Sequence, residues 1–302
     1  MASGKIVLKS ERDVAMLRRA ARLVEQVLAD VAGRIAPGIA TIELDRNAES
    51  VIRAAGARPA FKGYQFDPEE MPFPGSLCIS VNDVVVHGIP SPDTILHEGD
   101  IVSVDCGVEL GGYFGDFAYT FAVGEISEEN RALLDATKQS LYEGIHHARA
   151  GKRVGDIGHA VQTYTESRGY GVVTALVGHG IGQRLHEPPS VPNTGRRGWG
   201  KKLKRGMTVC IEPMINRGTA DVTVDADGWT IRTADGLPSA HYEHMVLVNK
   251  GAPEVLSSYD AIEAALVRTE AASRASADVL PEENSRVGAS ASVPASTEPA
   301  TA

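Results

Sequence analysis

The sequence lacks a hydrophobic run of the roughly 20 residues that a membrane-spanning helix needs. Its opening stretch, MASGKIVLKSERD, becomes charged before the apolar segment of a signal peptide could form. We therefore expect no membrane association and a cytoplasmic location. Hydrophobic residues make up 43% of the 302-residue chain and charged residues 23%, which is typical of a globular protein with a sizeable core.

Cysteine is also scarce. The three cysteines, Cys78, Cys106 and Cys210, are widely spread and show no CxxC spacing. This pattern argues against a disulfide framework and against a zinc site made of thiolates. Each cysteine lies in an apolar run, so we expect three buried strand residues.

Positive charge is not in excess. Lysine and arginine total 30 against 39 acidic residues, and the net charge of −9 argues against a DNA-binding protein. One segment, 196–205, is nevertheless rich in basic residues, namely Arg196, Arg197, Lys201, Lys202, Lys204 and Arg205. Two interpretations stay open for it: a solvated loop, or a contact for an anionic partner such as ribosomal RNA.

Helical and strand-like patterns alternate in blocks along the chain. Helical spacing predicts helices over 10–35, 41–55 and 128–149, and a fourth that Asp156 caps and that runs to 168. Strand patterns cover 77–81, 84–86, 101–108, 113–123, 207–211, 230–233 and 241–248. Helices followed by strands occur in 5–125 and again in 126–250, which hints at two similar halves and favours an α+β fold.

The composition changes near the end of the chain. We predict a single catalytic domain over residues 1–260. Residues 271–302 are rich in Ala, Ser, Pro and Glu and have few large apolar side chains. Such a segment buries too little surface to offset the entropy of ordering, so it is predicted to be a disordered tail.

Histidines and carboxylates concentrate in five segments beside strand-like or glycine-rich sequence. These segments are VNDVVVHGIP with His87, VDCGVELGGYFGD with Asp105 and Asp116, GHGIGQRLHEPP with His179 and His186, TVCIEPMIN with Glu212, and HYEHMVLV with Glu243.

Asp105 and Asp116 lie in apolar surroundings, where an ionised carboxylate is costly unless it is paired or bound to a metal. Between them, Gly111 and Gly112 are a hairpin turn signal. A chain that folds back at this turn brings the two carboxylates to one site. Because close like charges repel, a divalent cation between them is the simplest remedy.

Glu212 and Glu243 pose the same problem, because each adjoins an apolar run. Four carboxylates with a histidine favour Mn²⁺, Fe²⁺, Co²⁺ or Zn²⁺ over a soft metal. So many acids indicate two ions bridged by carboxylates, as in hydrolytic aminopeptidases. Taken singly, an acid near a strand end is more often a cap or an ion-pair residue, and we interpret Glu187, His241 and His244 as structural.

In this order, the five segments resemble the signature of the methionine aminopeptidases. The resemblance covers about residues 8–255, and VNDVVVHGIP and GHGIG followed by HEPP are its most specific parts. Glu212 and Glu243 lie 31 residues apart, which leaves no room for the helical insertion of the type II enzymes. The resemblance implies a type I enzyme with the pita-bread fold, in which two pseudo-symmetric α+β halves enclose the site.

The resemblance also implies roles for these residues. Two divalent ions would be held, one by Asp105, Asp116 and Glu243, the other by Asp116, His179, Glu212 and Glu243. Glu212 would relay a proton from the attacking water, His186 would stabilise the oxyanion, and His87 would contact the scissile nitrogen. The substrates would be the N-termini of nascent chains that begin with methionine followed by a small residue, and the enzyme would be a monomer.

The methionine pocket follows the family less closely than the metal ligands do. Its matching residues are Tyr64, Phe73, Cys78 and Trp229. Phe61 stands where many members have a small residue, Leu185 replaces an aromatic before His186, Phe114 replaces a histidine, and the segment 65–72 is longer than usual.

These departures leave alternatives open. One is a paralogue with a retuned pocket, which resists inhibitors or accepts a different N-terminal residue. Another is an X-Pro aminopeptidase or prolidase of the same fold, although those enzymes usually carry a large N-terminal domain. A metal-free binding module is the third alternative, and such a protein would be expected to lack the ligands that this chain retains.

Overall fold

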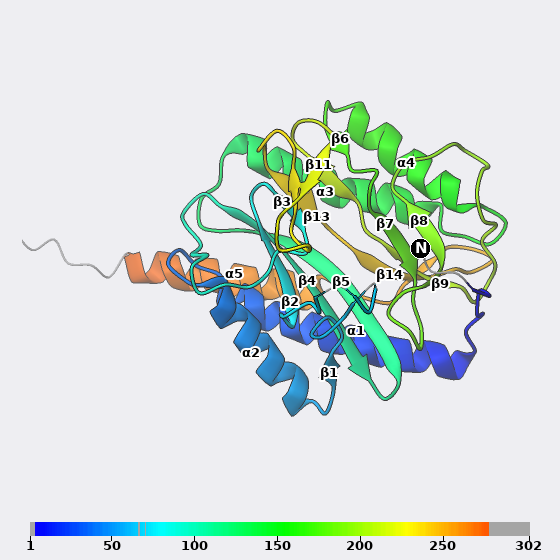
Figure 1. Cartoon of the computed structure of the whole chain (residues 1–302), viewed down its shortest axis with the longest axis horizontal. Helices are drawn as coiled ribbons and strands as arrows, with labels where there is room; N and C mark the ends of the chain where they lie inside the picture. The colour runs from blue at the N-terminus through cyan, green and yellow to red at the C-terminus, as the bar shows by residue number, and fades with distance from the viewer. Residues whose placement is uncertain (1–3, 66, 70, 278–302) are drawn as a thin grey trace, which may run out of the picture.

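The computed structural model of the chain describes residues 4–65, 67–69 and 71–277 (Figure 1). The helices are α1 (Glu11–Ala32), α2 (Thr41–Ala54), α3 (Glu128–His146), α4 (Val154–Glu166) and α5 (Asp260–Ala277). The strands of the first half are β1 (Arg58–Pro59), β2 (Leu77–Val81), β3 (Val84–Val86), β4 (Ile101–Leu110) and β5 (Tyr113–Ala122). Those of the second half are β6 (Gly171–Val172), β7 (Val177–Gly180), β8 (Glu187–Pro192), β9 (Thr208–Ile211), β10 (Met214–Asn216), β11 (Val222–Val224), β12 (Ile231–Thr233), β13 (Ser239–His241), β14 (His244–Leu247) and β15 (Glu254–Val255).

The first half is a four-stranded antiparallel sheet covered by helices. β4 lies between β1 and β2 on one path and also pairs with β5. Ser10 caps α1, and its hydroxyl accepts a hydrogen bond from the Asp13 N–H, as the sequence predicted. The apolar face of α1 packs on β4 and β5, and α2 and α5 lie beside it (Figure 1).

The β4–β5 hairpin confirms the turn predicted at Gly111-Gly112. Both glycines have positive φ, 60° and 83°, which a residue with a side chain adopts only at a cost. The turn sets the register of the pair, in which Gly107 faces Asp116. Side chains two residues apart on a strand share a face, so Asp105 and Asp116 point to the same side of the sheet.

The second half contains a five-stranded sheet in the order β15-β14-β9-β7-β8, against which α3 and α4 pack. The two halves meet where β5 runs beside β14. The backbone N–H of Glu243 donates to the carbonyl oxygen of Ala118 on β5 (3.1 Å), which ties the halves together at the candidate site.

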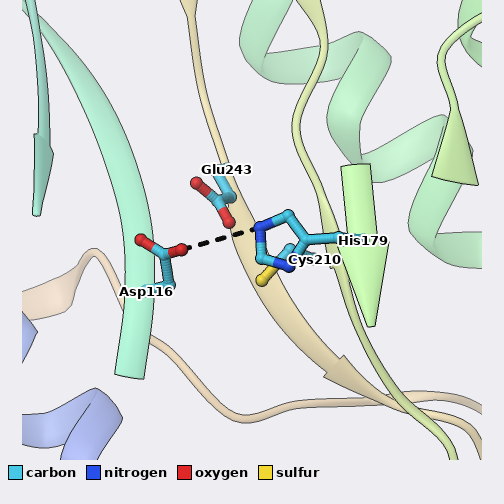
Figure 2. Close-up of side chains that lie close together, drawn as sticks. All are labelled: Asp116, His179, Cys210 and Glu243. Atoms are coloured by element: carbon cyan, nitrogen blue, oxygen red, sulfur yellow. Dashed lines mark ion pairs between the residues drawn. The ribbon is translucent and has the colours of Figure 1, made fainter. Parts of the chain in front are cut away.

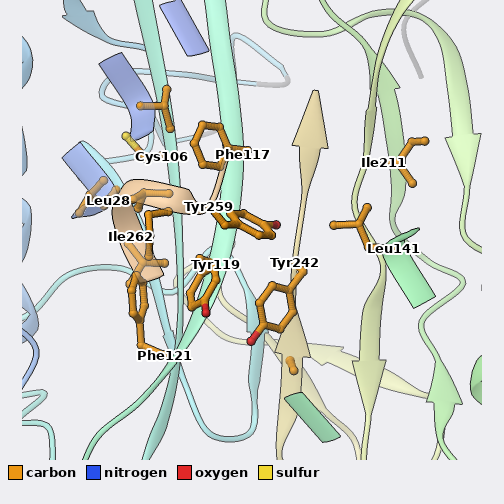
Figure 3. Close-up of a cluster of buried hydrophobic side chains, with 14 of the residues drawn as sticks. Leu28, Cys106, Phe117, Tyr119, Phe121, Leu141, Ile211, Tyr242, Tyr259 and Ile262 are labelled. Atoms are coloured by element: carbon orange, nitrogen blue, oxygen red, sulfur yellow. The ribbon is translucent and has the colours of Figure 1, made fainter. Parts of the chain in front are cut away.

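The main core fills the space between these layers. Figure 3 shows Phe117, Tyr119 and Phe121 of β5 near Tyr242 and Tyr259. Phe117 and Phe121 are fully buried, and each stabilises the fold by roughly 2–3 kcal/mol through burial. This aromatic cluster lies directly behind β5, so it holds in place the strand that carries Asp116.

Three predictions about elements differ from the structure. The predicted strand over 241–248 is two strands in different sheets, β13 and β14, because the backbone where they meet bonds to β5 instead: the His241 N–H donates to the Thr120 hydroxyl and the Glu243 N–H to the Ala118 carbonyl. Asp156 does not cap α4 but lies in its first turn, where its carboxylate accepts from the N–H of Arg153.

The last helix also extends beyond the predicted domain end at residue 260. α5 packs against α1, contributes Ile262 and Ala265 to the core, and continues to Ala277, in a segment rich in strong helix formers. The remainder of the predicted tail, 278–302, lies outside the described residues. Among the described residues, no helix has both the length and the apolar character to cross a membrane.

Candidate metal centre

The candidate ligands come from both halves of the molecule. Asp105 lies on β4 and Asp116 on β5, whereas His179 lies on β7. Glu212 directly follows β9 and Glu243 directly precedes β14, and the pairing of these two strands brings the glutamates together. All five line one cavity of about 590 Å³, so the structure brings the predicted ligands to a single place.

The ligand atoms are close enough to share cations. Figure 2 shows Asp116, His179 and Glu243 converging, with Cys210 beside them. One potential ligand atom of each of these four residues lies within 4.8 Å of the others. Asp105 lies in the same cavity, and its neighbouring charge contributes to raising the pKa of Asp116. Carboxyl groups this close favour one proton between them, which a cation can replace.

The orientation of His179 is that of a metal ligand. Its Nδ1 lies 2.9 Å from the carbonyl oxygen of Gly180, which only accepts, so Nδ1 carries a proton. Burial lowers the pKa of His179 to about 4, so the ring is neutral at pH 7 and Nε2 presents a lone pair. That lone pair faces oxygens of Asp116 (3.6 Å) and Glu212 (3.5 Å). These are distances typical of an ion pair, but the neutral ring has no positive charge and three electron-pair donors face one another. A cation between these acceptors resolves the conflict.

The carboxylates show the same need for positive charge. Burial raises the pKa of Asp105 to about 7, and burial together with the charges of neighbouring acids raises the pKa values of Asp116, Glu212 and Glu243 well above their ordinary range. Among the described residues, Oδ1 of Asp105, Oδ1 of Asp116 and Oε1 of Glu243 are buried without a hydrogen-bond partner. Oxygen and imidazole donors of this kind fit hard or borderline divalent cations.

Two further histidines flank this cluster, as the sequence predicted. His87 follows β3 with φ 57°, a strained conformation for a residue with a side chain and one that concentrates at functional sites. The ring of His186 lies edge-on to that of His179, with centroids 4.3 Å apart. Burial lowers the pKa values of His87 and His186 to about 4 and about 3, so both are neutral at pH 7.

An apolar wall forms the other end of the cavity. A buried cluster combines Phe61, Phe73, Cys78, Leu185 and Trp229, with Tyr64 and Phe114 packed against it. The Phe73 N–H donates to the Tyr64 carbonyl (2.9 Å), and the Gly63 N–H donates to the Phe73 carbonyl (2.8 Å). The indole N–H of Trp229 donates to the carbonyl of Met71 (2.8 Å). The predicted pocket residues are therefore brought together, and Met71 of the long segment contacts one of them.

Sequence reasoning missed several residues that surround the ligands. Cys210, interpreted only as a buried strand residue, has its sulfur within 4.8 Å of potential ligand atoms of Asp116, His179 and Glu243. Strand alternation could have signalled this, because Cys210 lies two residues before Glu212. The Tyr259 hydroxyl accepts from the Glu243 N–H (3.1 Å), and its single proton lies within hydrogen-bond distance of two carbonyls, those of Glu243 (2.7 Å) and Ala118 (2.9 Å). His241, interpreted as structural, lines the cavity.

Comparison with known proteins agrees with this geometry. The sequence pattern of metallopeptidase family M24 matches residues 15–250. The methionine aminopeptidase of Clostridium acetobutylicum is 47% identical over 252 residues, which are 83% of this chain and 98% of that protein.

Solved structures place the fold. The methionine aminopeptidase of Rickettsia prowazekii superposes with a TM-score of 0.81 at 37% identity, over 84% of this chain and all of that one. The prolidase of Pyrococcus furiosus gives a TM-score of 0.68 at 20% identity over 83% of this chain and 65% of that one, a likeness of fold alone. The pita-bread fold predicted from the sequence is confirmed. The chain belongs to metallopeptidase family M24, and within it to the methionine aminopeptidases.

Proposed function

We propose that this metallopeptidase removes the N-terminal methionine of nascent proteins whose second residue is small, with two divalent ions bound in its cavity. The observation that carries the proposal is the cluster of acceptors at one end of the cavity, where His179 Nε2 faces two carboxylates. An apolar wall suited to a thioether side chain lies at the other end of the same cavity.

The ligand assignment is the one that the resemblance to the methionine aminopeptidases implies, and the cavity that all five side chains line supports it. Asp105, Asp116 and Glu243 would hold one ion, and Asp116, His179, Glu212 and Glu243 the other, so that Asp116 and Glu243 would contribute to both. Mn²⁺, Fe²⁺, Co²⁺ and Zn²⁺ all suit this set of donors. Such ions, when bound, polarise a carbonyl and lower the pKa of a water molecule.

Glu212 is the proposed proton carrier. Its carboxylate faces the cavity, and its main-chain carbonyl accepts a hydrogen bond from the Asn193 amide (3.0 Å), which holds the residue at the end of β9. Burial and the nearby acids favour the protonated form of Glu212. A carboxylate with a raised pKa takes a proton from water more readily and can return it to the leaving amine.

His186 is the proposed donor to the scissile carbonyl. Burial raises the pKa of Tyr64, so its hydroxyl stays protonated and lies 2.6 Å from Nδ1 of His186. Donation by Tyr64 to Nδ1 places the ring proton of the neutral imidazole on Nε2. That N–H is then available to hydrogen-bond an oxygen on which negative charge develops. His87, which lines the same cavity, would contact the scissile nitrogen.

The direct test is release of methionine from Met-Ala-Ser and Met-Gly peptides. The metal-free protein is reloaded separately with Mn²⁺, Fe²⁺, Co²⁺ or Zn²⁺, and Leu-Ala-Ser and Xaa-Pro peptides serve as controls. Metal-dependent release restricted to methionine is the expected result. Cleavage of the control peptides instead would replace this proposal with a retuned pocket or an X-Pro activity, and calorimetric titration would give the number of ions.

We also propose contact with ribosomal RNA through the segment 196–205. Its basic side chains are exposed, and the Arg196 guanidinium stacks on Trp199, which is itself 61% exposed. Cations beside an exposed indole suit phosphates and unstacked bases, and they stand out against a net charge of −9.

Salt-dependent co-sedimentation with ribosomes tests this contact. Lys201→Glu combined with Lys202→Glu should reduce binding, whereas Arg22→Glu on α1 should not. Equal binding by both variants would exclude this segment as the ribosome contact.

We expect a monomer in the cytoplasm, because one chain supplies every proposed ligand and nascent N-termini emerge there. Sedimentation velocity checks the oligomeric state.

A further inference from the structure

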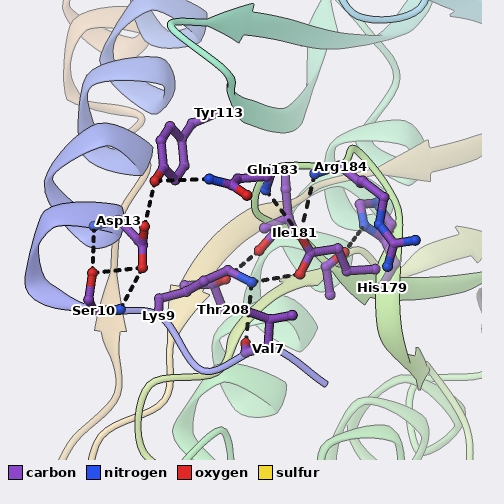
Figure 4. A network of polar contacts seen from close by, with 12 residues as sticks. Val7, Lys9, Ser10, Asp13, Tyr113, His179, Ile181, Gln183, Arg184 and Thr208 are labelled. Atoms are coloured by element: carbon purple, nitrogen blue, oxygen red, sulfur yellow. Dashed lines mark hydrogen bonds and ion pairs between the residues drawn. The ribbon is translucent and has the colours of Figure 1, made fainter. Parts of the chain in front are cut away.

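A buried ion pair joins the segment before α1 to the residue that follows His186. Lys9 Nζ lies 2.6 Å from Glu187 Oε2, and the two side chains are only 4% and 6% exposed. The residues are 178 positions apart in the sequence. Figure 4 shows Lys9 lying beneath the loop that carries Gln183 and Arg184.

Glu187 closes this loop on itself. Its second oxygen, Oε1, accepts hydrogen bonds from the backbone N–H groups of Gln183 (3.0 Å) and Arg184 (3.3 Å). At Gly182, a Cβ atom would lie 2.5 Å from both Glu187 Oε1 and Lys9 Cε, so the ion pair fills the space that a side chain would take. The loop 181–187 therefore wraps around one carboxylate, and Leu185 and His186 lie on it.

The other end of the ion pair is anchored as firmly. The Lys9 N–H donates to the carbonyl of Gly206 (2.6 Å), and Ser10 begins the capping box of α1 directly afterwards. A second connection runs in parallel: the Tyr113 hydroxyl donates to Asp13, and it accepts from the Gln183 side chain (3.2 Å). The start of α1 is thus fastened to the loop at two points (Figure 4).

Stability is a weak explanation for this arrangement. Desolvating two charges offsets most of their attraction, so a buried ion pair commonly contributes little net stability compared with apolar residues of similar size. What it does define is geometry, because Glu187 binds Lys9 through one oxygen and the backbone N–H groups of Gln183 and Arg184 through the other. These bonds set the position of His186, next in sequence to Glu187.

We propose that Lys9 and Glu187 are positioning residues for the hydrolytic reaction, which hold the loop 181–187 so that His186 meets the scissile carbonyl. This rests on the proposed function of His186. It assigns a role to the stretch before α1, which otherwise contributes no side chain to the cavity among the residues described. Loss of the ion pair should reduce kcat and leave metal content nearly unchanged, because the proposed ligands lie outside the loop. KM should change less than kcat, because Leu185 is one of several side chains in the apolar wall and the others stay in place.

The test compares Lys9→Met, Glu187→Gln, the double variant and the control Lys5→Met, whose lysine is exposed. Kinetics with Met-Ala-Ser give kcat and KM, and metal content and thermal midpoint are measured on the same samples. A single variant leaves one buried charge unpaired and should melt earlier, whereas the double variant removes both charges and should regain most of the midpoint. We expect kcat of the double variant to stay about 10- to 100-fold below wild type, the loss typical of small misplacements of reacting groups.

Hydrogen exchange provides a readout that is independent of turnover. The amides of Gln183 and Arg184 should exchange faster in Lys9→Met and in the double variant, while those of β4 and β5 should not. A double variant with kcat within about threefold of wild type, or with unchanged exchange in 181–187, would overturn the positioning role. If wild-type protein released no methionine, the proposed function would fail, whereas the exchange comparison would still report on the loop.

Discussion

The two ends of the cavity are built in different ways. At the ligand end, Asp105 and Asp116 lie on paired strands, Glu212 and Glu243 adjoin another pair, and His179 is held by a bond to the backbone. At the aromatic end, most side chains come from loops and meet through apolar contact. Strand register fixes the positions of the ligands relative to one another, so a shift of one strand changes the geometry of the whole ligand set. Apolar contact tolerates exchange between side chains of similar volume, and the departures from the family gather there.

The sharpest way to break the ligand end is Asp116→Ala. This change removes the carboxylate that both ions would share, so turnover should be abolished and metal binding strongly reduced. The fold should persist, because the loss also relieves repulsion among buried acids. Methionine release, metal titration and circular dichroism check this, with the exposed Asp93→Ala as the control. Near-normal turnover would remove the proposed metal assignment.

The ends touch at Tyr64, which belongs to the aromatic end but hydrogen-bonds to His186. Tyr64→Phe keeps the ring and removes the hydroxyl. Without the hydrogen bond to this hydroxyl, the His186 ring is no longer held by Tyr64 in one tautomer and one orientation. We expect kcat to fall about 10- to 100-fold with little change in KM. Tyr164→Phe on α4 is the matched control. If KM changed and kcat did not, Tyr64 would serve only the pocket.

The ligand end should also control how the metal-free protein responds to pH. For Asp105 the folded-state pKa of about 7 exceeds the ordinary 3.8, so the folded state holds an extra proton between these values and stability falls as pH rises through that window. The buried histidines act oppositely: their folded pKa values of about 3 to 4 lie below 6.5, and stability rises with pH until 6.5.

Above pH 6.5 the histidines no longer change the stability, and only the carboxylates with raised pKa values do. The free energy of unfolding of the metal-free protein should therefore fall by about 1.4 kcal/mol per pH unit for each extra proton that the folded state holds. Denaturant titrations with and without Mn²⁺ measure this. Bound metal should flatten the slope, and Asp105→Asn should reduce it. A metal-free protein that gained stability between pH 6.5 and 8 would contradict the charge cluster.

Features that depend on local sequence were predictable, and features that depend on contacts between distant segments were not. The hairpin glycines predicted that Asp105 and Asp116 come together at one site, because a turn is a local feature of the sequence. The break between β13 and β14 was not predicted, since it depends on backbone contacts of His241 and Glu243 with β5 across the two halves. Lys9 and Glu187 were equally hidden, because the two residues pair only through the tertiary fold.

The aromatic end should respond mildly to substitution. Leu185 is 4% exposed and packs among Phe61, Phe73 and Trp229, so Leu185→Phe enlarges one side chain of the wall and leaves every candidate ligand unchanged. Metal content should be unchanged, and kcat/KM for Met-Ala-Ser should shift by no more than about tenfold, the usual scale for adding or removing a small apolar group. Leu185→Met, of similar volume, is the control and should shift it less. Kinetics with Met-Ala-Ser and with Leu-Ala-Ser, together with metal analysis, separate the possibilities. Loss of metal in Leu185→Phe would show that the loop 181–187 couples the two ends, because this loop carries Leu185 and directly follows β7, which carries His179.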